Sequence, residues 1–283
     1  LCRDSGFRCL VATSGEEGLE LAERFMPQGI FLDIQLPGID GWTVLDALKN
    51  NSTTRHIPVH IASVEDKTLD ALRRGAVGYL QKPVELKGLE AAVQRLEDIF
   101  EKSVKELLIV EDDADLCLAM TRLIGNGDIT ITVARTGAEA LEFLAARSVD
   151  CMILDLGLPD MTGFELLEAL KATDELSPPV IVYTGKELTQ EEATELRGYA
   201  ESIIIKGVRS EERLLDETSL FLHRVVENLP EKKQRIIARL RDTDEVLEGK
   251  RVLLVDDDMR NAFALSRVLS RRGVDVTKAD NGQ

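Results

Sequence analysis

Short apolar runs that end in charged residues constrain the fold of this chain more than any other feature. Three runs in the middle of the sequence have this form: residues 107–110 precede Glu111 and Asp112, residues 151–154 precede Asp155, and residues 203–205 precede Lys206. Runs of this length and composition predict buried strands of a parallel sheet. Because the crevice of such a sheet lies at the carboxyl ends of its strands, we expect these charged side chains to gather there.

Three carboxylates gathered at one sheet edge would repel one another and resist ionisation unless a cation lay among them. A hard divalent ion such as Mg²⁺, which prefers oxygen ligands, meets this need. Lys206 adds an ammonium group at the end of a neighbouring run. A metal, a nucleophilic carboxylate and an ammonium group together suit the acceptance of a phosphoryl group.

The same motifs recur along the chain. Asp33 and Asp155 are each followed three residues later by Leu-Pro and eight residues later by glycine. Three further similarities accompany this one: residues 13–20 resemble 135–142, residues 78–83 stand where 203–207 stand, and residues 251–258 repeat the run that begins at 107. The sequence therefore contains one complete repeat flanked by two incomplete ones.

We divide the chain on this basis into four parts. They are a first repeat (1–100) without its first strand and most of its first helix, a complete second repeat (106–228), a helical linker (229–250), and a third repeat (251–283) with only a first strand, a first helix and a second strand. Strand-like and helix-like segments alternate through the second repeat, and its last helix is expected over 209–227. This alternation predicts an α/β fold, a doubly wound parallel sheet of five strands with helices on both faces.

Composition narrows the range of functions. The net charge of −16 argues against nucleic-acid binding, which needs a basic surface. No apolar run approaches the roughly 20 residues of a membrane-spanning helix, and no signal peptide is evident. The four cysteines have no C-x-x-C spacing, and Cys9 and Cys151 lie in apolar runs where burial is expected. A reducing cytoplasm is the expected location.

Taken together, these spaced motifs resemble the receiver domains of response regulators, the phosphoacceptor modules of two-component signalling. The resemblance implies a flavodoxin-like fold that is repeated, with two incomplete copies. The tandem array is similar to the C-terminal part of a multi-receiver hybrid sensor histidine kinase, whose catalytic domain would lie outside this chain. It implies a histidine kinase or phosphotransfer domain as the phosphohistidine donor, a signal relayed through protein contacts, and neither nucleic acid nor membrane as a partner of this fragment.

The resemblance also assigns roles in the second repeat. Asp155 would be the phosphoacceptor, forming an acyl phosphate that later hydrolyses, which is the only catalysis expected of the chain. Thr184 and Lys206 would each bind a phosphoryl oxygen. The Mg²⁺ ligands would be Glu111 (through water), Asp112, Asp155 and the carbonyl oxygen of Gly157.

The flanking repeats match only in part. In the first repeat the resemblance gives Asp33 as acceptor, Ser63 as the hydroxyl group and Lys82 as the ammonium group, and the Lys82-Pro83 peptide bond is often cis in the family. This repeat has no acidic strand of its own, so Asp33 should be phosphorylated poorly. In the third repeat Asp256 and Asp257 match the acidic pair, and the acceptor segment is not in the chain.

Two departures from the family pattern concern the conformational change that follows phosphorylation. Lys206 is followed by Gly207 where the family has proline, and Ile203 stands where the first repeat has Tyr79. The second repeat is therefore expected to accept phosphate and to transmit the change weakly or by another route.

Two alternatives to phosphoacceptance stay open. A degenerate receiver array could serve as a scaffold that only docks partners, a reading favoured by the incomplete repeats. An aspartyl phosphatase is disfavoured, because the position two residues after the acidic acceptor is Gln35 or Gly157 and not a second aspartate. The opening of the third repeat also complements what the first repeat lacks, so we expect self-association, within or between chains, that would join Asp256 and Asp257 to Asp33.

Overall fold

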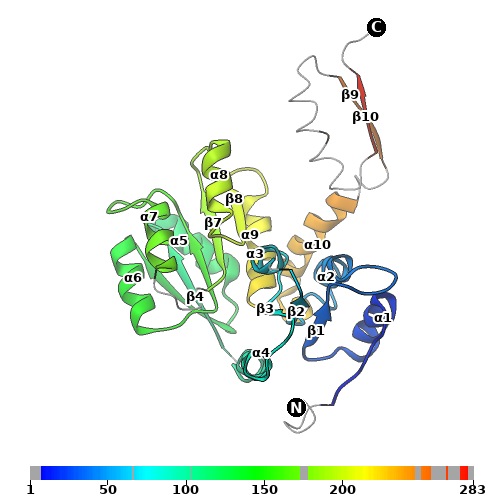
Figure 1. Cartoon of the computed structure of the whole chain (residues 1–283). Helices are drawn as coiled ribbons and strands as arrows, with labels where there is room; N and C mark the ends of the chain where they lie inside the picture. Colours follow the sequence, from blue (N-terminus) through cyan, green and yellow to red (C-terminus); the bar gives the residue numbers. More distant parts are fainter. Residues whose placement is uncertain are drawn as a thin grey trace. The chain divides into compact units, whose positions relative to one another are not determined.

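The computed structural model describes residues 8–65, 67–102, 104–172, 178–245, 250–255, 266 and 275–279. The chain forms two compact units, Leu1–Pro230 and Glu231–Gln283. The first unit contains the first and second repeats, which are coloured blue to yellow in Figure 1. Among the helices described, none is both long and apolar enough to cross a membrane.

The second repeat is built on a parallel sheet of five strands in the order β5-β4-β6-β7-β8. These strands are β4 (Lys105–Val110), β5 (Ile129–Ala134), β6 (Cys151–Leu154), β7 (Val180–Thr184) and β8 (Ser202–Ile205). The strand that comes first in the sequence, β4, pairs with β5 on one side and with β6 on the other. The order of connection therefore reverses between β4 and β6, which makes that position the topological switch point. The predicted doubly wound α/β fold is confirmed.

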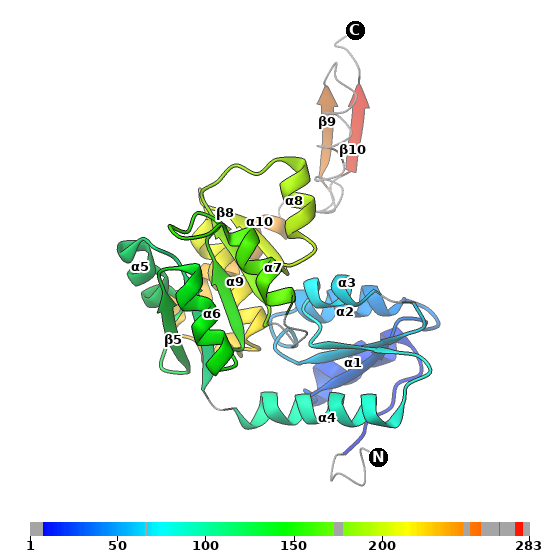
Figure 2. The same ribbon diagram turned by 60° about the vertical axis from the view of Figure 1, so that its left-hand side comes forward.

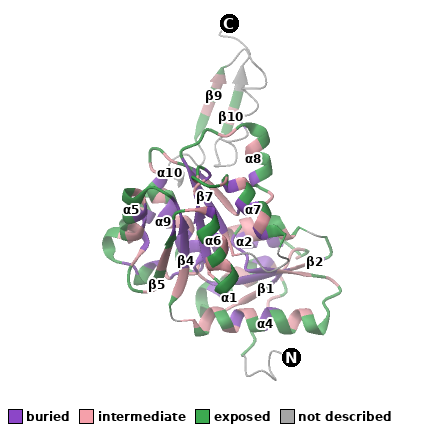
Figure 3. Ribbon diagram, turned by 90° about the vertical axis from the view of Figure 1, so that its left-hand side faces the viewer, coloured by how far each residue is buried: buried purple, intermediate pink, exposed green. Residues whose placement is uncertain are grey.

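Helices cover both faces of this sheet (Figure 2). Helices α5 (Ala114–Ile124) and α9 (Ser210–Phe221) contribute to the core on one face, and α6 (Gly137–Ala146), α7 (Gly163–Lys171) and α8 (Gln190–Leu196) to the core on the other. Successive residues of β4 alternate between the two cores, as the pleat of a strand requires. Figure 3 shows the resulting burial: strand β4 is largely purple, the colour of buried residues.

The first repeat has a smaller parallel sheet in the order β1-β2-β3. Its strands are β1 (Ile30–Asp33), β2 (Val59–Ser63) and β3 (Gly78–Gln81), and its helices are α1 (Gly15–Phe25), α2 (Gly41–Asn50), α3 (Thr68–Arg73) and α4 (Leu86–Glu101). The Lys82-Pro83 peptide bond is cis, as expected. In this sheet β1 is an edge strand, whereas its counterpart β6 in the second repeat lies between two strands.

An apolar groove of about 1040 Å³ runs beside β1 in the first repeat. Its lining includes Leu10, Ile30, Phe31, Leu48 and Leu96. In the second repeat the corresponding side of β6 is covered by β4, which supplies the fully buried Leu108 and Ile109. The groove is thus the place that a central strand would fill.

The second compact unit contains α10 (Glu231–Glu245), β9 (Arg251–Val255) and β10 (Asp275–Ala279). Strands β9 and β10 pair in parallel, with Leu253 opposite Thr277. Leu253 and Val255 are 63% and 52% exposed. The predicted acidic pair, Asp256 and Asp257, lies outside the described residues.

Two expectations from the sequence are wrong. The helix predicted over 209–227 ends at Phe221, and His223 has a φ of 53° in the left-handed region. The chain turns there because Arg224 reaches back to Asp128, with two hydrogen bonds of 2.8 Å, and to the carbonyl oxygen of Ile124 at 3.0 Å. Cys9 is exposed on the lining of the groove, in a segment (residues 8–12) that pairs with none of the described strands, whereas Cys151 is buried as predicted.

Glu217 on α9 should make the folded state less stable at high pH. Burial raises the pKa of its carboxyl group to about 7, and the charge of Asp216 adds to the effect. Between the ordinary glutamate pKa of 4.5 and about 7 the folded chain keeps a proton that the unfolded chain loses, so stability falls as pH rises through this range. Glu217→Gln should therefore stabilise the protein by about 1–3 kcal/mol at pH 8 and by little at pH 4. Urea unfolding at both pH values measures this, with the exposed Glu211→Gln as control, and an equal gain at both values would contradict it.

Candidate active site

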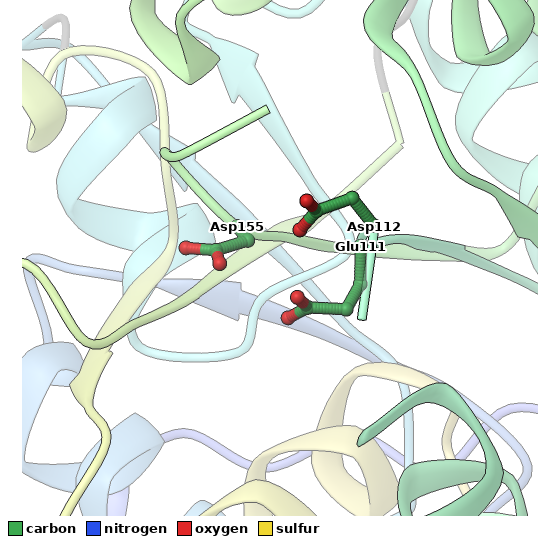
Figure 4. A group of neighbouring side chains, drawn as sticks. All are labelled: Glu111, Asp112 and Asp155. Carbon is green, nitrogen blue, oxygen red and sulfur yellow. The ribbon is translucent and has the colours of Figure 1, made fainter. Parts of the chain in front are cut away.

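Three carboxylates converge at the carboxyl end of the sheet in the second repeat. Glu111 and Asp112 follow β4, and Asp155 follows the neighbouring strand β6. One oxygen from each of the three lies within 4.8 Å of the others (Figure 4). Glu111 is 2% exposed, whereas Asp112 is exposed to solvent. Among the residues that the structure describes, this is the only group of three or more His, Cys, Asp or Glu side chains close enough together to hold a metal ion.

Backbone hydrogen bonds of the sheet hold these residues in place. The Glu111 N–H donates to the carbonyl oxygen of Ala134 at 3.0 Å, and the Asp155 N–H donates to that of Val110 at 2.9 Å. The Asp155 carboxylate also accepts a bond of 2.7 Å from the Leu156 N–H, which fixes its orientation. Asp113, which follows Asp112, caps α5 with its carboxylate, which accepts from the Asp115 and Leu116 N–H groups. The cluster is therefore a direct result of strand register.

Lys206, at the end of β8, inserts its ammonium group between two of the carboxylates. Its Nζ donates to Glu111 Oε2 at 2.8 Å and to Asp155 Oδ2 at 2.9 Å. Burial alone would lower the pKa of Lys206, but the bonds to the two carboxylates outweigh it and raise that pKa. The ammonium group is thus charged at neutral pH and faces the point where the carboxylates meet.

The pKa values of Glu111 and Asp155 shift in opposite directions. Burial raises the pKa of Asp155, yet the hydrogen bonds from Lys206 and Thr184 and the charge of Lys206 bring it below its ordinary value. For Glu111 burial is the dominant effect, so its pKa is raised despite the bonds from Lys206. Asp155 therefore stays ionised more readily than Glu111, and an ionised carboxylate oxygen is what a nucleophile requires.

Thr184 and Gly157 complete the predicted set. Thr184 ends β7 and is 1% exposed, and its hydroxyl group accepts from the Lys186 N–H at 3.2 Å. The same hydroxyl group is near enough to Asp155 to lower the pKa of that carboxylate. Gly157 lies in the loop after Asp155, where it forms an isolated bridge with Thr162. The structure thus brings together Glu111, Asp112, Asp155, Thr184 and Lys206, with Gly157 in the adjoining loop.

Sequence reasoning missed Tyr183 and Ser210. The ring of Tyr183 lies beneath Lys206, with Nζ 5.6 Å from the ring centroid. The Tyr183 hydroxyl group is 3.0 Å from Ser210 Oγ at the start of α9. A tyrosine inside an apolar strand carries no sign that its partner lies 27 residues further along the chain, so no local pattern could have found this pair.

The first repeat assembles only part of such a site. Asp33 at the end of β1 accepts hydrogen bonds from Lys82 and, at 3.0 Å, from the Gln35 N–H. Burial raises the pKa of Asp33, but the Lys82 bond and the backbone bonds together bring it below its ordinary value. Ser63 ends β2 next to β3 and is 5% exposed. In the part of the chain that is described, Asp33 belongs to no group of three or more side chains that could hold a metal ion.

Comparison with known proteins is consistent with this arrangement. The response regulator receiver domain family matches residues 1–94 and 107–218. The nitrate/nitrite response regulator protein NarL of Escherichia coli K12 is 40% identical over 85 residues, which are 30% of this chain and 39% of that protein. Response regulator MprA of Mycobacterium leprae is 28% identical over 218 residues, 76% of this chain and 90% of that protein.

Among solved structures, the BeF3-activated receiver domain of Klebsiella pneumoniae RstA matches 41% of this chain and 97% of its own, with 25% identity and a TM-score of 0.37. The chain spans 39% of the length of NarL and 90% of the length of MprA. Because the family matches both the first and the second repeat, over more than half of the sequence, the chain belongs to the response regulator receiver domain family of two-component signalling.

Proposed function

We propose that the second repeat accepts a phosphoryl group on Asp155 and relays the signal through protein contacts. The observation that supports this most is the contact of Lys206 with both Asp155 and Glu111, inside a cluster of three carboxylates. Such a site holds a nucleophile, a place for a cation and a fixed positive charge within reach of one another. A degenerate scaffold would have no need to keep them together.

The chemistry of the transfer follows from this geometry. An oxygen of the ionised Asp155 attacks the phosphorus of a phosphohistidine, the P–N bond breaks, and the electron pair leaves with the imidazole. Lys206 and the Thr184 hydroxyl group, which lie beside Asp155, would bind phosphoryl oxygens as negative charge shifts onto them. Water later attacks the acyl phosphate and restores Asp155. Receiver domains in general take the phosphoryl group from a histidine kinase. For this chain we propose a histidine kinase or a phosphotransfer domain as the donor. We also propose that the parent protein is a cytoplasmic hybrid kinase.

The acidic cluster fits a divalent cation of the magnesium type. Its donors are carboxylate oxygens, which are the ligands of hard cations, and the exposed Asp112 leaves one side open to water. Glu111, Asp112, Asp155 and the carbonyl oxygen of Gly157 would hold the ion. When bound, Mg²⁺ would neutralise charge on the transferring group.

The test is the intact mass of the full chain after incubation with acetyl phosphate and Mg²⁺. We expect one phosphoryl adduct, and none when a chelator replaces the metal. If neither acetyl phosphate nor a phosphorylated histidine donor produced an adduct, the scaffold function would replace this proposal.

In the first repeat, no acidic pair accompanies Asp33 and Lys82 among the described residues, and we propose that this repeat acts mainly through protein contacts.

We further propose that β9 of a second copy of this chain fills the groove beside β1. In the second repeat β4 pairs with β5 on one edge and with β6 on the other. Strand β9 already pairs with β10, and β1 corresponds to β6, so joining them gives the order β10-β9-β1-β2-β3. Leu253 in β9 corresponds to Leu108 in β4 and is 63% exposed, whereas Leu108 is fully buried. A buried leucine of this kind stabilises by about 1.5–3 kcal/mol.

This association predicts a dimer whose proportion rises with protein concentration. Light scattering coupled to size-exclusion chromatography of the full chain should detect it, and Leu253→Asp should abolish it. Leu118→Asp, an equally drastic change at a surface position of α5 that is 48% exposed, serves as control and should leave the dimer intact. A wild-type chain that stays monomeric at every concentration would contradict the proposal, and β9 bound within its own chain would then be the alternative to examine.

A further inference from the structure

A partly buried ion pair joins the first and second repeats, which belong to the same compact unit. Arg55, in the loop between α2 and β2, bonds both carboxylate oxygens of Asp216 on α9, one of them with Nη2 at 3.2 Å. Arg55 is only 2% exposed. This two-pronged geometry is the strongest form of an arginine–carboxylate contact. Removing Asp216 would leave the buried charge of Arg55 without this counterion, which is costly.

Neighbouring contacts hold the Arg55 loop in this position. The buried Lys49 donates to the carbonyl oxygens of Arg55 at 3.1 Å and of Ile57 at 2.6 Å. A second contact between the repeats joins Leu220 on α9 to Gly75. A Cβ atom built on Gly75 would lie 3.2 Å from Cδ1 of Leu220, so the two residues pack closely. Gly75 has a φ of 85°, a conformation that favours glycine. The first repeat therefore contacts α9 through both charge and close packing.

The opposite end of α9 is attached to the candidate active site. The helix begins at Ser210, whose N–H donates to the carbonyl oxygen of Gly207 at 3.1 Å and whose Oγ accepts from the Gly207 N–H at 3.2 Å. Gly207 directly follows Lys206, whose ammonium group bonds Asp155. The Ser210 hydroxyl group also meets Tyr183 beneath Lys206. A continuous set of contacts thus runs from Asp155 through Lys206 and Ser210 to Asp216 and Arg55.

We propose that the Arg55–Asp216 pair couples the phosphoryl state of Asp155 to the docking of the first repeat on α9. The inference rests on the proposed function. A phosphoryl group on Asp155 presents new anionic oxygens to Lys206, which exchanges its bond to Glu111 for one of them. The segment from Lys206 to Ser210 shifts with it, and α9 moves against Arg55. Because coupling between two equilibria is reciprocal, the docking of Arg55 must in turn change the affinity of the Asp155 site for a phosphoryl group.

Reciprocity makes the proposal testable with a phosphoryl analogue. The affinity of the full chain for beryllofluoride in the presence of Mg²⁺ is measured for wild type, Arg55→Glu, Asp216→Arg and the double variant. Each single variant is expected to change the dissociation constant by about fivefold or more, and the double variant, which restores a pair with reversed charges, should return it toward the wild-type value. Arg74→Glu is the control, because Arg74 bonds Asp46 within the first repeat at 2.6 Å and carries the same change of charge.

Hydrogen exchange separates the possible outcomes. In the single variants residues 51–58 should lose protection while β4 keeps it, which shows that the repeats have separated without unfolding. Separation without a change in beryllofluoride affinity would overturn the coupling and leave the proposed function standing. A wild-type chain that bound no beryllofluoride and took up no phosphoryl group would overturn both.

Discussion

Asp155→Asn should abolish the phosphoryl adduct that we expect acetyl phosphate and Mg²⁺ to produce on the wild-type chain. The asparagine amide has no nucleophilic carboxylate oxygen, and it removes one of three negative charges from a cluster whose oxygens lie within 4.8 Å of one another. The side chain has nearly the same size and can still accept the 2.7 Å bond from the Leu156 N–H, so the fold should persist. Intact mass spectrometry measures the loss directly.

Asp33→Asn provides the matched control, because Asp33 stands at the corresponding strand end of the first repeat and is also paired with a lysine. We expect this variant to keep the full adduct, since no described acidic pair supports Asp33. An adduct that survived in Asp155→Asn and vanished in Asp33→Asn would reverse the assignment. It would also indicate that Asp256 and Asp257 of another copy complete the site of the first repeat.

Lys206→Met should slow phosphoryl transfer by about 10²–10³-fold while leaving metal binding intact. The ammonium group lies 2.9 Å from Asp155 Oδ2, where it can meet negative charge on the transferring group. Its loss leaves Glu111 and Asp155 without a fixed positive neighbour, so the affinity of the cluster for Mg²⁺ should rise or stay the same. Methionine keeps the apolar stem that covers Tyr183. The initial rate of adduct formation and a Mg²⁺ titration measure the two effects separately.

Lys186→Met is the control for this substitution. Lys186 lies two residues after Thr184, but its ammonium group bonds Glu192 at 2.8 Å and its side chain is 51% exposed. Its replacement should leave the transfer rate unchanged. If Lys206→Met transferred phosphate at the wild-type rate, the lysine would serve only to neutralise Glu111 and Asp155 in the absence of metal.

Much of the second repeat could be predicted from local pattern. The apolar runs at 107–110 and 151–154 became the adjacent strands β4 and β6, and their following acids met at one edge, because parallel strands place their carboxyl ends together. The end of the last helix could not be predicted in this way. It depends on Arg224 finding Asp128, a partner 96 residues earlier in the chain.

The sequence by itself therefore determined which residues form strands and helices and which charged side chains reach the site, because apolar periodicity and strand-end position are local properties. Tertiary structure alone decided how those side chains share their partners: that Lys206 bonds Glu111 as well as Asp155, that Tyr183 meets Ser210, and that Arg55 meets Asp216 161 residues away. Such pairs depend on register and on the packing of separate elements against one another. No spacing in the sequence encodes them, because their energies arise only when distant segments exclude water together.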